Sequence, residues 1–125
     1  MENQEKIALL KTFAEAFNKH DIETLMACMT PDCIYEGSAG THAHGTRFSG
    51  AKEVRQSFLD IFKAFPDAQW NDDTHFVSGD RGCSMWYFTG TYANGKQVEV
   101  NGCDLFTFRD GKIHIKDSYR KNRTK

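Results

Sequence analysis

The sequence predicts an α+β fold in which three N-terminal helices cover one face of a curved antiparallel sheet. Apolar residues recur every three or four positions as far as Pro66, which is typical of amphipathic helices. After Pro66 the apolar period falls to two, as in strands. The pairs Asn94-Gly95 and Asp110-Gly111 then separate successive strand-like runs, as in antiparallel hairpins. No repeat or linker divides the 125 residues, so we expect one domain over residues 1–125.

Three segments of the N-terminal half have helical periodicity. The first covers residues 4–19. The second is shorter, begins after the favourable N-cap Asp21 and ends at Thr30-Pro31, because proline cannot continue a helix. The third begins at Ser49 or Gly50 and ends before Pro66. Each segment has a single apolar stripe, so all three helices are expected on the same face of the sheet.

A short first strand is expected at residues 32–37. A loop rich in glycine, serine and histidine connects it to the third helix. Four further strands are expected at residues 68–79, 83–93, 96–109 and 112–121. A strongly curved sheet leaves a cavity wherever the helices do not fill it. Ligand sites favour such cavities.

Composition excludes several classes of function. Acidic and basic residues number 17 and 16, for a formal charge of −1, so nothing favours nucleic acid as a partner. No stretch approaches the length of a membrane span, and the charged N-terminal segment does not resemble a signal peptide. The four cysteines lack CxxC spacing and are expected to be free and mostly buried. We therefore expect a cytoplasmic protein with no membrane partner.

Asp104 interrupts the apolar face of the strand at residues 96–109. The even positions of this strand are the more apolar, so they should face the helices, and Asp104 with them. A buried carboxylate without partners costs several kcal/mol. Asp104 must therefore be protonated, be paired or border a wet pocket, and Gly102 leaves space beside it. The alternative is that Asp104 only locks the sheet through hydrogen bonds.

The last strand allows two orientations. If its isoleucines point inward throughout, Asp117 or Tyr119 enters the pocket. If the strand has a bulge, Lys116 and Ser118 enter instead, and a lysine facing Asp104 would hold the carboxylate ionised. Aromatic residues suit either a core or a pocket wall. The expected pocket lining comprises Phe13, Tyr35, Phe58, Phe62, Trp86, Phe88, Gly102, Phe106, Lys116 and Ser118.

Two histidines, His42 and His44, lie in the loop before the third helix. An imidazole titrates near neutral pH, so either one could form an acid/base pair with Asp104. A His-x-His pair could also hold a metal with Glu36 or Asp104 as a third ligand, but this pattern is weak evidence, and a plain exposed loop is the other alternative. We expect no metal and no cofactor. His75 and His114 are expected on the strand surface, and His20 at the end of the first helix.

Four stretches carry a family resemblance, namely "FAEAFNKHD", "MTPDCIYEG", "FSGAKEVR" and "DLFTFRDGKI". With them the chain resembles, over nearly its whole length, the cystatin-like, cone-shaped domains of the nuclear transport factor 2-like superfamily. The similar subgroup contains SnoaL-like polyketide cyclases and ketosteroid isomerase-like proteins. The resemblance implies a small apolar ligand and a homodimer through the outer sheet face, where Cys103, Leu105 and Thr107 would lie. It does not imply one reaction, because the superfamily includes isomerases, cyclases, epoxide hydrolases, dehydratases and non-catalytic proteins.

The resemblance places Asp104 where ketosteroid isomerases and SnoaL-like cyclases have an acidic residue of the active site. Other positions depart from these patterns. Phe13 replaces the isomerase tyrosine, Gly37 replaces the aspartate base, and Gly102 replaces the arginine of the epoxide hydrolases. Steroid isomerase and epoxide hydrolase activities are therefore disfavoured.

The sequence leads to one main functional prediction. Asp104, paired with His42 or His44, would catalyse cofactor-independent isomerisation, cyclisation or dehydration of an apolar carbonyl compound. A non-catalytic ligand-binding or dimerisation module is the alternative. Metal-dependent hydrolysis is a third possibility.

Overall fold

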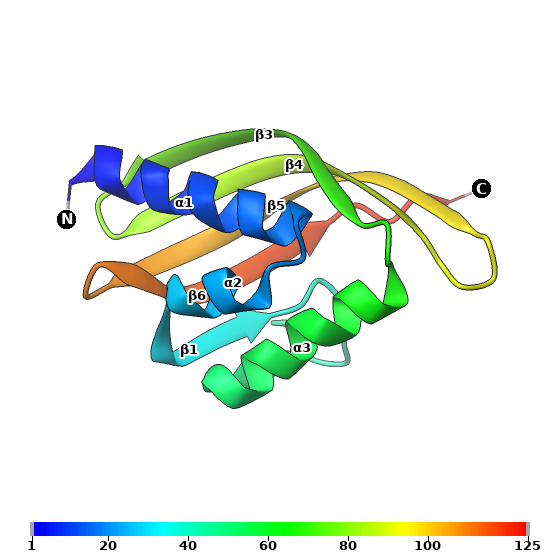
Figure 1. Cartoon of the computed structure of the whole chain (residues 1–125), viewed down its shortest axis with the longest axis horizontal. Helices are drawn as coiled ribbons and strands as arrows, with labels where there is room; N and C mark the ends of the chain where they lie inside the picture. Colours follow the sequence, from blue (N-terminus) through cyan, green and yellow to red (C-terminus); the bar gives the residue numbers. More distant parts are fainter. Residues whose placement is uncertain (1, 125) are drawn as a thin grey trace.

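The computed structural model describes residues 2–124 and confirms the α+β fold (Figure 1). Helix α2 begins at its expected N-cap, Asp21, whose carboxylate accepts a hydrogen bond from the Thr24 amide at 3.2 Å. It ends earlier than expected, so that Met29 and Pro31 belong to the following strand. The elements in chain order are α1 (Asn3–Asn18), α2 (Ile22–Ala27), β1 (Met29–Glu36), β2 (Arg47–Ser49), α3 (Ala51–Ala64), β3 (Gln69–Ser78), β4 (Arg81–Thr91), β5 (Gln97–Arg109) and β6 (Lys112–Arg120).

The strands form one sheet in the order β2-β1-β6-β5-β4-β3. Strands β3 to β6 pair as the expected antiparallel meander. Two details differ from the sequence prediction. Strand β1 pairs with β6 in parallel, and the loop before α3 contains the short strand β2, which pairs with β1. Both depend on contacts between distant segments, which local periodicity does not report.

The three helices cover one face of the sheet, as expected (Figure 1). Helix α1 packs against β3, and α3 packs against β1 and β2. The core beneath them is aromatic, with Phe13, Phe17 and Phe58 in edge-to-face contact at centroid distances of 4.9–6.3 Å. A second apolar cluster, containing Phe65 and Phe88, lies toward the β4–β5 hairpin, and Trp70 packs against both clusters. None of the helices in residues 2–124 is long and apolar enough to cross a membrane.

Bulges in β3 and β6 decide which side chains face the helices. The β6 bulge between Ile113 and Ile115 buries Lys116 and Ser118, which settles the orientation that the sequence left open. The β3 bulge lies between Asn71 and Thr74, where Asp72 adopts a positive φ of 55°. Beyond the bulge, odd-numbered side chains of β3 point toward the helices in place of even-numbered ones. The prediction that His75 lies on the strand surface is therefore wrong, and its side chain is only 3% exposed.

Candidate functional site

Asp104 is buried on the inner face of β5 and accepts three hydrogen bonds. Lys116 Nζ donates to Oδ1 at 3.1 Å, and the Ser118 hydroxyl donates to the same oxygen. Trp86 Nε1 donates to Oδ2 at 3.0 Å. Lys116 also donates to Ser118 Oγ at 2.8 Å, which closes a triangle of polar contacts. Of the three ways to accommodate a buried carboxylate, the structure shows pairing.

Lys116 is enclosed by aromatic rings as well as by Asp104. Its ammonium nitrogen lies 4.6 Å from the centroid of Tyr35, 5.0 Å from that of Phe17 and 5.8 Å from that of Phe58. Ring faces carry partial negative charge and attract a desolvated cation. The aromatic rings and the carboxylate therefore surround the ammonium group of Lys116, which is only 5% exposed.

Gly102 allows Trp86 to reach Asp104. A Cβ atom built on Gly102 would lie 2.4 Å from the Trp86 indole and 2.6 Å from the backbone oxygen of Tyr119. The indole thus occupies the space that a side chain at this position would fill. The sequence indicated this role for Gly102 in making space, but not which residue uses the space.

A cavity of about 170 Å³ lies in front of this network, on the helix side of the sheet. Its polar wall contains Lys116, Ser118 and the indole of Trp86, which are the three donors to Asp104. Asp104 itself lies one layer behind them. The rest of the lining is mainly aromatic and comprises Phe17, Tyr35, Ser38, Ile61, Phe65, Trp70, Phe88 and Arg120.

A second, smaller cavity of about 20 Å³ borders Asp104 directly. It is large enough for about one water molecule. Phe13, Phe106, Ser84 and Asp73 contribute to its lining. A water molecule could therefore lie next to the carboxylate of Asp104, but this cavity is too small for a ligand.

A polar chain that the sequence did not predict leads away from this small cavity. Ser84 is the cross-strand partner of Asp104, and its hydroxyl lies 2.7 Å from His75 Nδ1. His75 Nε2 lies 2.6 Å from Asp73 Oδ2. Because a carboxylate only accepts, Nε2 carries the hydrogen, and in the neutral ring Nδ1 accepts from Ser84. Alternation along the sequence did not predict these contacts, because the β3 bulge changes which side chains of the strand point inward.

Arg120 is the other site residue that sequence reasoning missed. It lies in a basic C-terminal segment, where side chains are usually solvated, although it shares the parity of Lys116 and Ser118. In the structure its guanidinium carbon lies 5.4 Å from the centroid of the Phe88 ring. Its Nε is buried and has no hydrogen-bond partner within residues 2–124. The shared parity was the signal that could have identified it.

Gly102 lines neither inner cavity but the hollow on the outer face, and the other predicted site residues divide into three groups. Tyr35, Trp86, Phe88, Lys116 and Ser118 line the 170 Å³ cavity, and Phe13 and Phe106 line the small one together with Asp104. Phe58 and Phe62 lie in the core. His42 and His44 stack on each other in the loop, with ring centroids 5.2 Å apart. Neither histidine lines a described cavity or bonds to Asp104, so the geometry gives the expected pairing with Asp104 no support.

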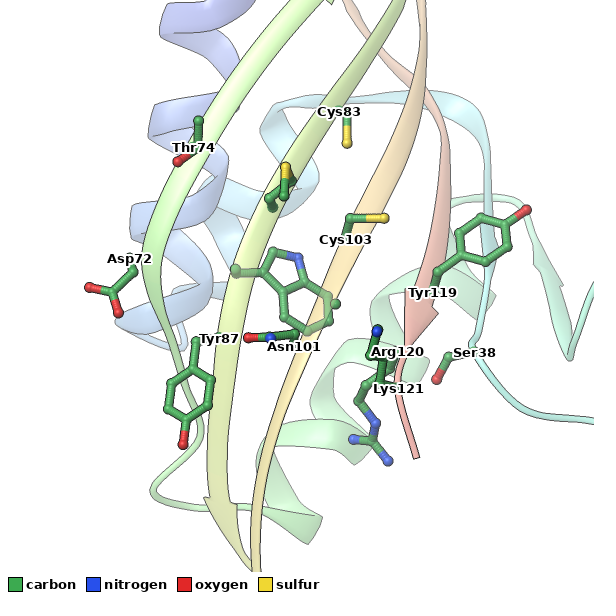
Figure 2. Close-up of a pocket in the computed structure, with 13 residues that line it drawn as sticks. Ser38, Asp72, Thr74, Cys83, Tyr87, Asn101, Cys103, Tyr119, Arg120 and Lys121 are labelled. Carbon is green, nitrogen blue, oxygen red and sulfur yellow. The ribbon is translucent and has the colours of Figure 1, made fainter. Parts of the chain in front are cut away.

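An open hollow of about 950 Å³ lies on the outer face of the sheet (Figure 2). Tyr87, Cys103 and Tyr119 project from its floor, and Arg120 and Ser38 border both this hollow and the inner cavity. Met85 and Tyr119 are 50% and 53% exposed here. All four cysteines are free thiols. Burial, followed by the nearby Cys103 and Asp104, raises the pKa of Cys83 to about 11.

Known proteins share this fold at low sequence identity. A candidate polyketide cyclase from Xanthomonas campestris pv. campestris is 22% identical, with 96% of this chain and 92% of that chain covered and a TM-score of 0.85. A nuclear transport factor 2-like protein of unknown function from Mesorhizobium loti is 24% identical, with coverages of 96% and 93% and a TM-score of 0.79. TerC, co-crystallised with polyporic acid, is 19% identical, with coverages of 94% and 92% and a TM-score of 0.79. No curated protein matches the chain.

A protein-family comparison assigns the chain by its sequence and not by its fold alone. The SnoaL-like domain family matches residues 10–114, which run from the middle of α1 to the first residues of β6. The solved structures have the same nuclear transport factor 2-like, cystatin-like architecture. The chain therefore belongs to the SnoaL-like domain family and has the nuclear transport factor 2-like, cystatin-like fold.

Proposed function

We propose that this protein binds a small apolar carbonyl compound in the 170 Å³ cavity and catalyses cofactor-independent proton transfer on it. The observation that carries the proposal is the arrangement of Lys116 and Ser118. Both side chains line the cavity, and both donate hydrogen bonds to the buried carboxylate of Asp104 behind them. Isomerisation, cyclisation and dehydration all require this kind of proton transfer next to a carbonyl group.

Each polar group has a distinct part in the proposal. The ammonium of Lys116 stabilises negative charge that develops on the carbonyl oxygen of the ligand. Asp104 is the proton acceptor and donor. Because Asp104 does not line the larger cavity, the Ser118 hydroxyl passes the proton between the carboxylate and the ligand. Trp86 holds the second carboxylate oxygen and so fixes the orientation of the group.

The family context supports a small-molecule ligand. TerC, a structural neighbour, was co-crystallised with polyporic acid, and another neighbour is described as a candidate polyketide cyclase. The aromatic lining of the cavity suits an apolar ligand of this general kind. These neighbours are under 25% identical, so the substrate of this chain is proposed from its own cavity.

Hydrogen exchange at carbon tests the proposal without knowledge of the natural substrate. The α-hydrogens of 2-tetralone exchange with D₂O through the enolate, and NMR measures the rate. We expect the wild-type protein to accelerate this exchange, Asp104→Asn to abolish the acceleration and Ser118→Ala to reduce it strongly. The exposed Asp110→Asn variant is the matched control. Thermal unfolding verifies that each variant is folded. Full acceleration by Asp104→Asn would refute the role of Asp104.

A non-catalytic binding module is the second candidate, and one observation favours it. Both oxygens of Asp104 are already occupied by donors, and the larger cavity does not reach the carboxylate. Saturation-transfer NMR with 2-tetralone separates the two functions. Binding without accelerated exchange by the wild-type protein would establish the binding module.

We also propose that the outer sheet face forms a homodimer. The exposed apolar side chains of Met85 and Tyr119 lie on this face, together with the half-buried Cys103 and Leu105. Light scattering after size exclusion should give twice the mass of the chain, and Met85→Lys should give the monomer mass. Four free thiols suit a reducing compartment, so a cytoplasmic location remains part of the proposal.

A further inference from the structure

We infer that the ligand of the 170 Å³ cavity carries a negative group on its small, flat aromatic body, and that this group binds the guanidinium of Arg120. This inference names the ligand class of the site proposed above, and so rests on that site, although not on its catalytic role. Three features of the cavity carry it: its charge balance, the geometry of Arg120 and the aromatic walls.

The charge balance of the cavity favours a negative ligand. Among the described residues, the lining contains two cationic side chains, Lys116 and Arg120, and no carboxylate. Lys116 forms an ion pair with Asp104 on the side away from the cavity, with 3.1 Å between Nζ and Oδ1. Within residues 2–124 no carboxylate lies within ion-pair distance of Arg120. The positive charge of Arg120 therefore has no carboxylate partner among the described residues, and an anionic group in the cavity would pair with it.

Arg120 is also held in a geometry that suits an anion. Its guanidinium lies on the Phe88 ring, at 5.4 Å from the centroid, so stacking limits the plane of the group. The Nε–H is buried and without a hydrogen-bond partner in the described chain. A guanidinium can bind a carboxylate through Nε and a neighbouring Nη in two parallel hydrogen bonds. A carboxylate bound in this way would satisfy the buried donor and the charge together.

The walls of the cavity favour a flat aromatic body for the ligand. Tyr35, Trp70, Trp86, Phe65 and Phe88 present ring surfaces to the cavity. Ring faces and edges pack well against a planar aromatic molecule. A volume of about 170 Å³ is below the roughly 300–1,000 Å³ of pockets for drug-sized ligands, which favours a ligand of one or two rings.

Two probes of the same shape test the inference by calorimetry on the full chain. 2-Naphthoate carries the negative group at pH 7, and 2-acetylnaphthalene carries a neutral carbonyl on the same ring system. We expect 2-naphthoate to bind at least about tenfold more tightly, as a charge-assisted hydrogen-bonded pair requires. Arg120→Gln should remove that preference, because it weakens the binding of 2-naphthoate much more than the binding of 2-acetylnaphthalene. Arg120→Lys should restore only part of the preference, because an ammonium cannot form the paired hydrogen bonds.

A matched control and three outcomes complete the test. Arg123→Gln removes a nearby exposed arginine and should keep the full preference. Equal affinity of the wild-type protein for both probes would overturn the anion inference and leave the proposed binding site in place. An equal loss of affinity for both probes in Arg120→Gln would also overturn it, because Arg120 would then only maintain the shape of the cavity. Failure of both probes to bind the wild-type protein would overturn the binding site as well as the inference.

Discussion

Replacing Lys116 by methionine should remove the charge partner of a buried carboxylate while keeping most of the side-chain volume. The side chains of Asp104 and Lys116 are 9% and 7% exposed, so solvent can replace little of the lost interaction. Ser118 and Trp86 would still donate to Asp104, but neither carries a charge. The carboxylate would thus remain buried without its counter-ion.

The size of the effect follows from this burial. Removing one partner of a buried ion pair costs about 3–5 kcal/mol of stability. For a domain of this length, that loss lowers the melting temperature by on the order of 10–20 °C. Replacing both partners, as in Asp104→Leu with Lys116→Met, removes both charges together. The double variant should therefore be destabilised by clearly less than the sum of the two single variants.

Urea unfolding of the wild-type protein, both single variants and the double variant measures this coupling. Lys112→Met, an exposed lysine of the same strand, is the control and should change the free energy of unfolding by less than about 0.5 kcal/mol. A loss below about 1 kcal/mol in Lys116→Met would contradict the assignment of a buried ion pair. The ion pair would also be contradicted if the stability loss of the double variant equalled the sum of the losses of the two single variants.

Three further predictions concern the surroundings of the site. Gly102→Ala should cost about 1–3 kcal/mol and shift the Trp86 fluorescence, because the new methyl group would lie 2.4 Å from the indole; an unchanged urea midpoint would argue against this contact. Cys83 should react with iodoacetamide at pH 8 about a hundredfold more slowly than an ordinary thiol, because its pKa of about 11 leaves little thiolate; mass spectrometry showing alkylation as fast as in the unfolded chain would contradict this. Burial raises the pKa of Asp117 above 3.8, so the folded state disfavours its ionised form, and Asp117→Asn should stabilise the protein at pH 7. That gain should disappear below pH 3.8, where the carboxyl is protonated in both states, and urea midpoints equal to those of the wild type at pH 7 would refute the prediction.

Much of the fold and the centre of the site could be predicted from the sequence. The change of apolar period at Pro66 and the two glycine turns predicted the helices and the meander, because these signals are local to each segment. The alternation along β5 predicted that Asp104 points inward, and Gly102 predicted space beside it. These inferences held because β5 is regular throughout its length, so that parity alone decides its facing.

The tertiary structure alone decided what surrounds Asp104. The bulges in β3 and β6 turn His75 and Lys116 inward, and a bulge is a property of two paired strands rather than of one strand's sequence. His42 and His44 likewise stack on each other in the loop at residues 37–46 and line none of the described cavities, which their spacing in the sequence did not reveal. The sequence by itself determined that a carboxylate is buried. Only the packing of β4 and β6 against β5 determined that Trp86, Lys116 and Ser118 hold it, because those contacts join residues 12 to 18 positions apart.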